Sequence, residues 1–553
     1  MTGRAYLEPR RIQEGQQQEK ILLLLVSCIN RADRRDCLSP TLIPASMDYQ
    51  RLVDIGETPS FQTSVAVGVA VIAFQYIWQS SSKRDEKTTK TTSKDSKTPR
   101  YGPSLPANYE IHPEAKEYPA DGTWMETLGH IALFVFSHFI CYYLWWAAEF
   151  NSGCIGNPFP IKPEVYRAAA PTATSVTIYT TFCAAQLLFS ATLPGVTVMG
   201  LKIPSWNGQR LPYHCNGLAS WYLTIAIMFA LHYTGIFDFA SIYTQSGALL
   251  STGVLAADLV AIIMYIECLR TKRASLPPKS GSVAHDFVMG QYLNPRIRFG
   301  DVDLKLWAEI RVSWMFLYAL DVSAAMTLQR QLGYIPYRMW IVLLIHGLYT
   351  NACQKGEESI PFTWDIFHER WGWMLIYWNM VGVAFAYTFN GRFIAEQGAD
   401  LQDFSFPVFV CMALAVIASY WVFDEANAQK NRFRAKDLPG GYQVRKFSFP
   451  QLPNATLKEP VKHLLTAKGS KLLTDGWYAY CRKPHYTSDL CLALLLSLTG
   501  GFGHVLPYFF VAFFFPMLVQ RSYRDNQRCA AKYGKDWDRY CKEVPYILVP
   551  GVY

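Results

Sequence analysis

The sequence predicts an all-α polytopic membrane protein with about nine or ten transmembrane helices. Two observations carry this prediction. Of the 553 residues, 51% are hydrophobic and 15% are aromatic, which excludes an ordinary cytosolic enzyme. Apolar stretches close to the roughly 20 residues that cross a hydrocarbon core also recur along most of the chain.

The predicted spans form a series along the chain. Within it, the stretch 339–349 is the weakest, because it needs flanking residues to reach spanning length. A shorter stretch, 61–78, is predicted as an additional first span. The last apolar region, 490–519, is interrupted by a Gly-rich run at 499–503, so we expect a broken helix or a helical hairpin there. The clearest stretches are 124–147, 175–193, 217–236, 247–266, 306–328, 339–349, 371–389 and 404–423.

Polar segments divide the chain further. Residues 1–60 are predicted to be disordered, and residues 79–123 form a basic, Ser/Thr/Lys/Pro-rich linker. The main transmembrane region is 124–423, followed by a C-terminal region at 424–553. With the linker in the cytosol, the basic loops fall on the cytosolic side, and the loop 237–245, which has no Lys or Arg, falls on the other side. The net charge of +9 is therefore attributed to membrane topology rather than to nucleic-acid binding.

The cysteines indicate no metal or disulfide framework. Thirteen are present, but none forms a CxxC pair or lies with histidines at a metal-ligand spacing. Several also fall inside predicted spans. We therefore expect neither a structural disulfide nor a metal site.

Three polar segments on the predicted cytosolic side combine cations with aromatic side chains. They are residues 427–434, 471–489 and 520–553. Cations suit the pyrophosphate and 2′-phosphate of a nicotinamide dinucleotide, and aromatic faces suit its rings. The same composition also suits a surface that faces anionic lipid headgroups, so composition leaves both interpretations open.

Longer motifs favour the cofactor interpretation over the lipid-surface interpretation. They include LPGVTVMG (193–200), YHCNGL (213–218), DFVMGQYLNPR (286–296) and KLWAEIR (305–311). With the C-terminal segments, they resemble the sterol reductase family, which includes delta-14, delta-7 and fungal C-24(28) reductases and the lamin B receptor. The resemblance extends from about residue 120 to the end of the chain.

Three further motifs resemble the fungal delta-24(24(1)) reductases. They are WDIFHERWGWMLIYWNMVG (364–382), FPQLP (449–453) and GWYAYCRKPHYTSD (476–489). This resemblance implies NADPH-dependent reduction of the C-24(28) double bond of a sterol side chain. That reaction is the last step of ergosterol biosynthesis, in the endoplasmic reticulum membrane. Ala384 replaces the usual proline of the family, which leaves the helix geometry near the sterol open.

The resemblance also implies which residues hold NADPH in a cytosolic-facing C-terminal pocket. Lys430 and Arg434 would contact phosphates, with Arg521 as a further anionic clamp. The residues implied to line the adenosine and nicotinamide channel are Leu473, Tyr478, His485 and Tyr486. His485 replaces an Asn that is common in the family, but still offers a hydrogen-bond donor.

A helix face completes the implied cofactor set. Asp525, Cys529 and Tyr533 follow one another at intervals of four residues, so one face of a helix would present them together with Arg521. For each of them singly, packing is the alternative role, and for Cys529 the two roles are evenly balanced.

The chemistry requires an acid. A hydride cannot add to an unactivated alkene, because no oxygen carries the resulting negative charge, so protonation must come first or at the same time. A tyrosine backed by a carboxylate suits this task. We predict that Tyr540 donates the proton and that Asp525 relays it. Asp286 and Glu309 are alternative acids.

These two alternative acids have a simpler interpretation as well. Asp286 and Glu309 could instead form a salt bridge to Arg296 or Arg311 at the membrane surface. The sterol itself is expected to enter from the bilayer into an apolar pocket among the central helices, in contact with membrane lipids. Candidates for its walls are His232, Trp371, Trp373 and Trp378.

Three other functions remain open. A sister enzyme could reduce the delta-14 or delta-7 bond of the sterol ring. Membrane methyltransferases that use S-adenosylmethionine have a similar C-terminal segment, but lack the upstream LNPR and NGL motifs. A non-enzymatic sterol-binding scaffold resembling the lamin B receptor is the third alternative. Association with other sterol-biosynthesis enzymes is a further expectation, and nucleic acid is not expected as a partner.

Overall fold

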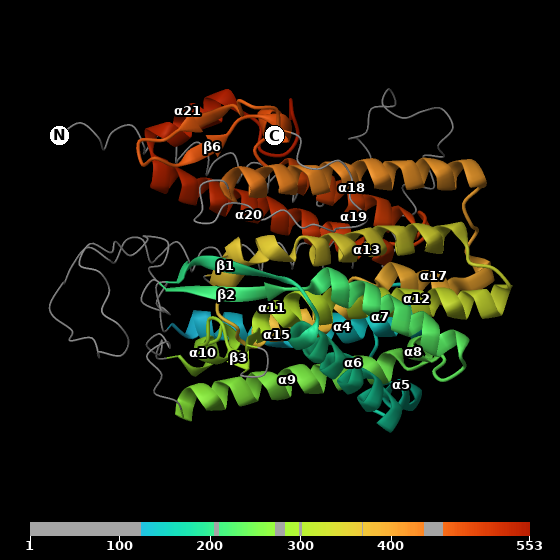
Figure 1. Ribbon diagram of the computed structural model, residues 1–553. Helices are drawn as coiled ribbons and strands as arrows, with labels where there is room; N and C mark the ends of the chain where they lie inside the picture. Colours follow the sequence, from blue (N-terminus) through green and yellow to red (C-terminus); the bar gives the residue numbers. More distant parts are fainter. Residues whose placement is uncertain are drawn as a thin grey trace, which may run out of the picture. The chain divides into compact units, whose positions relative to one another are not determined.

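The computed structural model describes residues 123–203, 209–270, 282–297, 301–367, 369–435 and 457–552. The segments 1–60 and 61–78, the linker up to residue 122 and the FPQLP motif lie outside the described residues. The described residues are mainly helical, as predicted, with long helices stacked in layers (Figure 1).

Long helices occupy the predicted spans. They are α4 (Trp124–Phe150), α6 (Ala173–Thr192), α7 (Gly217–Tyr233), α9 (Ser246–Arg270), α13 (Tyr337–Lys355) and α18 (Phe406–Ala435). Among the described residues, α4, α9 and most of α18 are long and apolar enough to cross a membrane by length and composition. The count of nine or ten spans stays a prediction.

Two of the predicted spans are composite helices with a π-helical turn. The first runs through α11 (Leu304–Trp307), η5 (Ala308–Val312) and α12 (Ser313–Leu332). The second runs through α15 (Trp373–Tyr377), η7 (Trp378–Gly382) and α16 (Val383–Ala386), and is followed by α17 (Phe389–Gln397). Such π turns are frequent at functional sites. Ala384, which replaces the usual proline of the family, is a buried residue of α16 and lies two residues after η7 ends. This substitution therefore lies next to the irregular part of the second helix.

Three small hairpins modify the all-α prediction. They are β1 (Val196–Ile203) with β2 (Gln209–Cys215), β3 (Arg296–Ile297) with β4 (Val302–Asp303), and β5 (His463–Leu465) with β6 (Lys471–Leu473). Each pair is antiparallel. The motif at 193–200 therefore lies mostly in β1, and the motif at 213–218 runs from the end of β2 into α7, with Val196 opposite Cys215.

The predicted break in the last apolar region is confirmed. α19 (Pro484–Leu498) ends before the Gly-rich run, and α20 (Phe509–Tyr533) begins beyond it. α19 packs between α18 and α20 (Figure 1). α21 (Lys535–Glu543) then follows Gly534, which has a positive φ of 55°. The remaining short elements are α5 (Pro163–Ala169), α8 (Ala240–Thr244), α10 (Val283–Val288), η6 (Glu357–Phe362), α14 (Trp364–Phe367), η8 (Gly398–Asp400), η9 (Gly476–Ala479) and η10 (Leu506–Tyr508).

Two motifs that are distant in sequence cross at a pair of glycines. A Cβ atom on Gly290 would lie 2.3 Å from the backbone nitrogen of Gly372, and Gly290 also has a positive φ of 91°. The Trp371 backbone nitrogen donates to the Tyr292 carbonyl at 2.7 Å. Glycine is required on both sides because the backbones approach too closely for a side chain.

A buried ion pair joins three further segments. The Arg311 guanidinium donates to Glu357 Oε1 at 2.6 Å and to Asn216 Oδ1 at 2.7 Å. The other carboxylate oxygen of Glu357 accepts from the Gly217 backbone nitrogen at 2.6 Å. Arg311 is 1% exposed and Glu357 is fully buried. The YHCNGL and KLWAEIR motifs therefore meet at this carboxylate, and Arg311 is not paired with Glu309.

Candidate functional site

The predicted cofactor region forms one structural unit, which we call the C-terminal lobe (residues 457–487 and 520–552). The backbone nitrogens of Arg482 and Lys483 donate to the carbonyls of Tyr546 and Ile547, both at 2.9 Å. Figure 1 shows α21 and β6 together beside α20. The stretch before α19 and the end of the chain therefore lie together in the described residues.

The C-terminal end of α18 packs against this lobe. The Trp477 backbone nitrogen donates to Gln429 Oε1 at 3.0 Å. Gly476 has a positive φ of 59°, and a Cβ atom there would lie 2.4 Å from the same oxygen. A glycine is therefore needed where η9 meets α18. This contact brings Lys430 and Arg434, one helical turn apart on α18, to the lobe.

Lys430 and Arg434 are suited to bind an anion. The Lys430 ammonium lies 5.8 Å from the centre of the Tyr478 ring, within cation–π range. Among the described residues, no carboxylate forms an ion pair with Lys430 or Arg434. Phosphate groups could therefore pair with both cations without displacing an existing partner.

Aromatic side chains lie next to these cations. The Tyr478 hydroxyl lies 3.2 Å from His485 Nδ1, and the His485 and Tyr486 ring centres are 4.5 Å apart. Leu473 and Tyr478 are buried in one apolar cluster. Burial, followed by the nearby Lys430 and Lys483, holds the pKa of His485 well below its ordinary value. His485 is therefore a neutral imidazole near pH 7, able both to donate and to accept.

Asp525 occupies the centre of a charge cluster. Lys483 forms an ion pair with it, and the Arg528 guanidinium donates to its other oxygen at 2.8 Å. Burial opposes ionisation of this carboxyl, but Lys483 and Lys430 outweigh it and hold its pKa well below the usual range. A carboxyl that stays ionised is a poor relay for protons, so this environment favours a binding role.

Tyr540 has a different hydrogen-bond partner from the one predicted. Its hydroxyl donates to the Leu473 carbonyl at 3.2 Å, and its ring stacks on Trp537 with the centres 5.1 Å apart. Burial raises the pKa of Tyr540. Within the described residues no direct hydrogen bond joins Tyr540 to Asp525. Its predicted role as proton donor therefore stays a prediction.

The predicted helix face exists in α20, but its members have different partners. Arg521 pairs with Asp365 of α14 at 3.3 Å. Cys529 and Tyr533 pack against the cluster around Trp537 and Tyr540. These two residues therefore belong to the apolar packing of the lobe, whereas Asp525 joins the cation cluster.

The family assignment follows from comparison with known proteins. The model of the Ergosterol biosynthesis ERG4/ERG24 family matches residues 137–553. The chain belongs to this family. The predicted resemblance to sterol reductases is thereby confirmed.

Named relatives in this family have two different specificities. A Delta(24(24(1)))-sterol reductase of Gibberella zeae is 35% identical over 451 residues, which cover 79% of this chain and 74% of the relative. A second, from Aspergillus fumigatus, is 37% identical over 385 residues, covering 70% and 80%. A Delta(14)-sterol reductase of Methylotuvimicrobium alcaliphilum is 33% identical over 420 residues, covering 75% and 92%.

The region that matches the ERG4/ERG24 family contains a polar pair that was not predicted from the sequence. The Tyr349 hydroxyl, on α13, donates to Asp489 Oδ1, on α19, at 3.0 Å. Asp489 is 8% exposed. Both residues were visible in the sequence, at the edges of apolar stretches, but 140 residues separate them. Only the packing of α13 against α19 reveals the pair.

Lys483 is a second residue of this region whose role was not predicted from the sequence. It directly precedes Pro484, the first residue of α19. Proline is common at the first position of a helix, so the sequence itself indicates a helix start at this point. Arg296, one of the two arginines considered as partners of the alternative acids, lies 2.9 Å from Asp301 and 3.7 Å from Asp303. Asp286 is itself buried, on α10.

The four candidates for the sterol walls lie in different surroundings. Trp371 and Trp373 are buried, and the Trp373 indole donates to Asp258 Oδ1 at 2.7 Å. Trp378 stacks on Phe513 of α20, with ring centres 6.1 Å apart. His232 Nδ1 lies 3.7 Å from Asp238. Trp378 is thus the candidate that faces the helix leading to the C-terminal lobe.

Proposed function

We propose that this protein is a membrane sterol reductase that uses NADPH to reduce the C-24(28) double bond of a sterol side chain. This reaction would be the last step of ergosterol biosynthesis, in the endoplasmic reticulum membrane. The main support is the identity of 35% and 37% to two fungal proteins named Delta(24(24(1)))-sterol reductase, each matched over most of its length. The chemistry of the C-terminal lobe agrees with it.

The C-terminal lobe and the end of α18 that packs against it together suit a phosphorylated dinucleotide. Lys430 and Arg434 would hold phosphates, and Tyr478, His485 and Tyr486 would contact the rings. Bound NADPH would supply the hydride. Neutral His485 would orient the cofactor by donating or accepting a hydrogen bond, while Asp525 keeps Lys483 in place.

Two tyrosines compete for the role of acid. Tyr540 is the predicted donor, but its hydroxyl faces the Leu473 carbonyl. Tyr349 has the expected tyrosine–carboxylate arrangement with Asp489. This pair also lies where α13 packs against α19, among the helices that a water-insoluble alkene would reach from the bilayer. We favour Tyr349 as the group that protonates the terminal methylene carbon, which leaves a tertiary, allyl-stabilised cation for the hydride.

A ring reductase is the second candidate, because a bacterial Delta(14)-sterol reductase is matched over 92% of its length. Sterol profiling of cells that lack this chain separates the two functions. Accumulation of a sterol with a methylene side chain is the expected result. A ring-unsaturated intermediate would assign the chain to the sister reaction, and an unchanged sterol profile would contradict both.

Cofactor binding is tested separately on the purified protein. We expect the protein to bind NADPH and not S-adenosylmethionine. The opposite preference would favour a methyltransferase. Binding of a sterol without either cofactor would favour a scaffold.

A further inference from the structure

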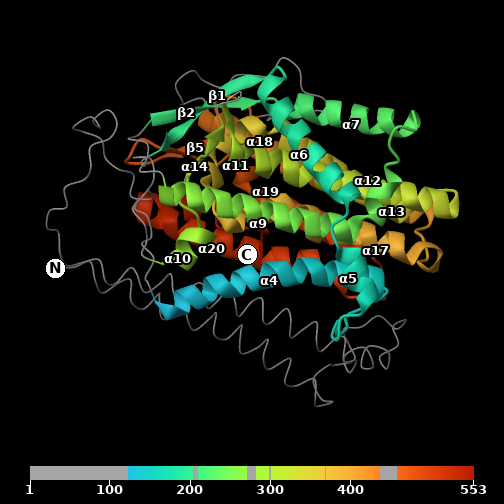
Figure 2. The same ribbon diagram turned by 90° about the horizontal axis from the view of Figure 1, so that it is seen from below.

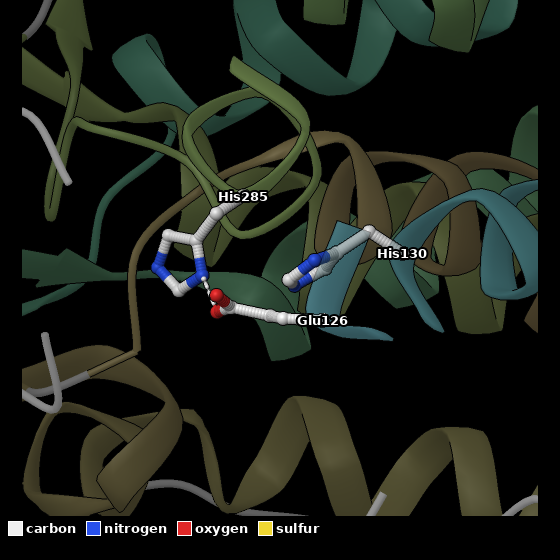
Figure 3. A group of neighbouring side chains, drawn as sticks. All are labelled: Glu126, His130 and His285. Carbon is white, nitrogen blue, oxygen red and sulfur yellow. Dashed lines mark hydrogen bonds and ion pairs between the residues drawn. The ribbon is translucent and has the colours of Figure 1, made fainter. Parts of the chain in front are cut away.

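A cluster of potential metal ligands lies at the start of α4. Glu126 is in the first turn of this helix, His130 is one turn later, and His285 is on α10. The three side chains point toward one another (Figure 3). One ligand atom from each residue lies within 4.8 Å of the others. None of the three belongs to the C-terminal lobe.

The backbone prepares this arrangement. Glu126 and His130 are four residues apart and therefore share one face of α4. Thr123 caps α4 by accepting from the Glu126 backbone nitrogen at 3.2 Å, and Ser282 caps α10 by accepting from that of His285 at 3.3 Å. Each cap therefore fixes the backbone of a residue whose side chain belongs to the cluster. α4 and α10 lie beside each other in Figure 2.

The distances are close to those of a metal site. His285 Nδ1 lies 2.9 Å from Glu126 Oε1, and the rings of His130 and His285 meet edge to face with centres 5.1 Å apart. In a tetrahedral zinc site, ligand atoms about 2.0–2.1 Å from the ion lie roughly 3.3 Å from one another. Small side-chain rotations would therefore bring all three ligand atoms to bonding distance.

The chemical character of the cluster favours a transition metal. Imidazole nitrogens suit zinc, iron and similar ions, whereas magnesium and calcium prefer oxygen ligands. His130 is 1% exposed, so the ion would be largely shielded from solvent on that side. The side chains of His285 and Glu126 are 16% and 14% exposed, so the cluster is partly open to solvent on their side.

We propose that Glu126, His130 and His285 bind one divalent transition-metal ion, with Zn²⁺ as the preferred ion. The ion joins the start of the first described helix to α10, in which the DFVMGQYLNPR motif begins directly after His285. Three protein ligands leave a fourth position for water. The inference does not depend on the proposed sterol reaction.

The test uses the full-length protein, purified in detergent and stripped with a chelator. Zn²⁺, Fe²⁺ or Mn²⁺ is added back separately, and bound metal is measured by elemental analysis. We expect about one zinc ion per chain and a rise of the thermal midpoint on adding zinc. Glu126→Gln and His285→Gln should weaken zinc binding at least about tenfold. His463→Gln changes an exposed histidine outside the cluster and should bind zinc as the wild type does.

Three results would overturn the proposal. They are no stoichiometric ion with any of the three metals, equal binding by the cluster variants and the wild type, and a loss of binding in His463→Gln alone. If a cluster variant does not fold, the wild-type protein still decides the question. Chelation should lower its thermal midpoint, zinc should restore it, and Co²⁺ should give the visible absorption of a tetrahedral site. A spectrum without these bands would indicate an adventitious metal only.

Discussion

Lys483 forms an ion pair with Asp525, and this contact joins the start of α19 to the polar half of α20, 42 residues later. Both side chains are largely shielded, with 12% and 24% exposure. A partly buried pair of this kind is costly to break, because the remaining charge loses its partner.

The first prediction concerns this pair. Asp525→Asn should lower the free energy of unfolding by about 1–3 kcal/mol, because Lys483 loses its counterion. Measurement of Asp525→Asn, Lys483→Gln and the double variant gives the coupling between the residues. Additive effects in that cycle would show that the pair contributes no stability.

The second prediction concerns Lys430. Lys430→Met should raise the Kd for NADPH at least about tenfold, because a charge-assisted contact to phosphate is lost. Titration of purified protein measures this. Lys468→Met is the matched control, since Lys468 is an exposed lysine in the turn between β5 and β6. An unchanged Kd in Lys430→Met would remove this residue from the cofactor site.

The third prediction separates the two tyrosines. Tyr349→Phe should reduce turnover by about 10²–10⁴-fold while NADPH binding stays normal, because the acid is lost. Tyr540→Phe removes only a bond to the Leu473 carbonyl, so we expect a loss of stability of about 1 kcal/mol with most turnover retained. The reverse pattern would restore Tyr540 as the donor.

The fourth prediction is a pH effect at His485. Its pKa is lowered on folding, so the unfolded chain binds the proton more readily. The stabilisation is complete above the ordinary pKa of about 6.5 and decreases as the pH falls toward the folded-state pKa. It should decrease by up to about 1.4 kcal/mol for each pH unit.

Thermal midpoints between about pH 7.5 and 5.5 check this effect. His485→Asn removes the titrating group and keeps an amide donor, so its midpoint should fall less than that of the wild type. Parallel curves for the two proteins would mean that His485 does not cause the loss.

The fifth prediction concerns the buried pair of Arg311 and Glu357. Glu357→Gln leaves Arg311 without a counterion in an environment where it is 1% exposed. We expect a loss of about 3–5 kcal/mol and poor recovery of folded protein. Glu358→Gln is a neighbouring control at a partly exposed position. Equal stability of both variants would contradict the role of the pair.

Much of the helical architecture could be predicted from hydrophobic stretches alone. An apolar run of suitable length predicts a helix because the backbone must satisfy its own hydrogen bonds where water is absent. The break at 499–503 was predictable for a related reason, since a Gly-rich run interrupts the apolar stretch. The hairpin of β1 and β2 was not predicted, although two motifs mark its strands.

By itself, the sequence determined the helical membrane character, the family motifs and the cation-rich composition of the C-terminal segments. Only the tertiary structure decided which side chains meet. Asp525 joins Lys483 rather than Tyr540, Tyr349 meets Asp489, and Glu126 meets His285 across 159 residues. The reason is physical: residue spacing determines neighbours along one helix, whereas contacts between helices depend on how complete helices pack.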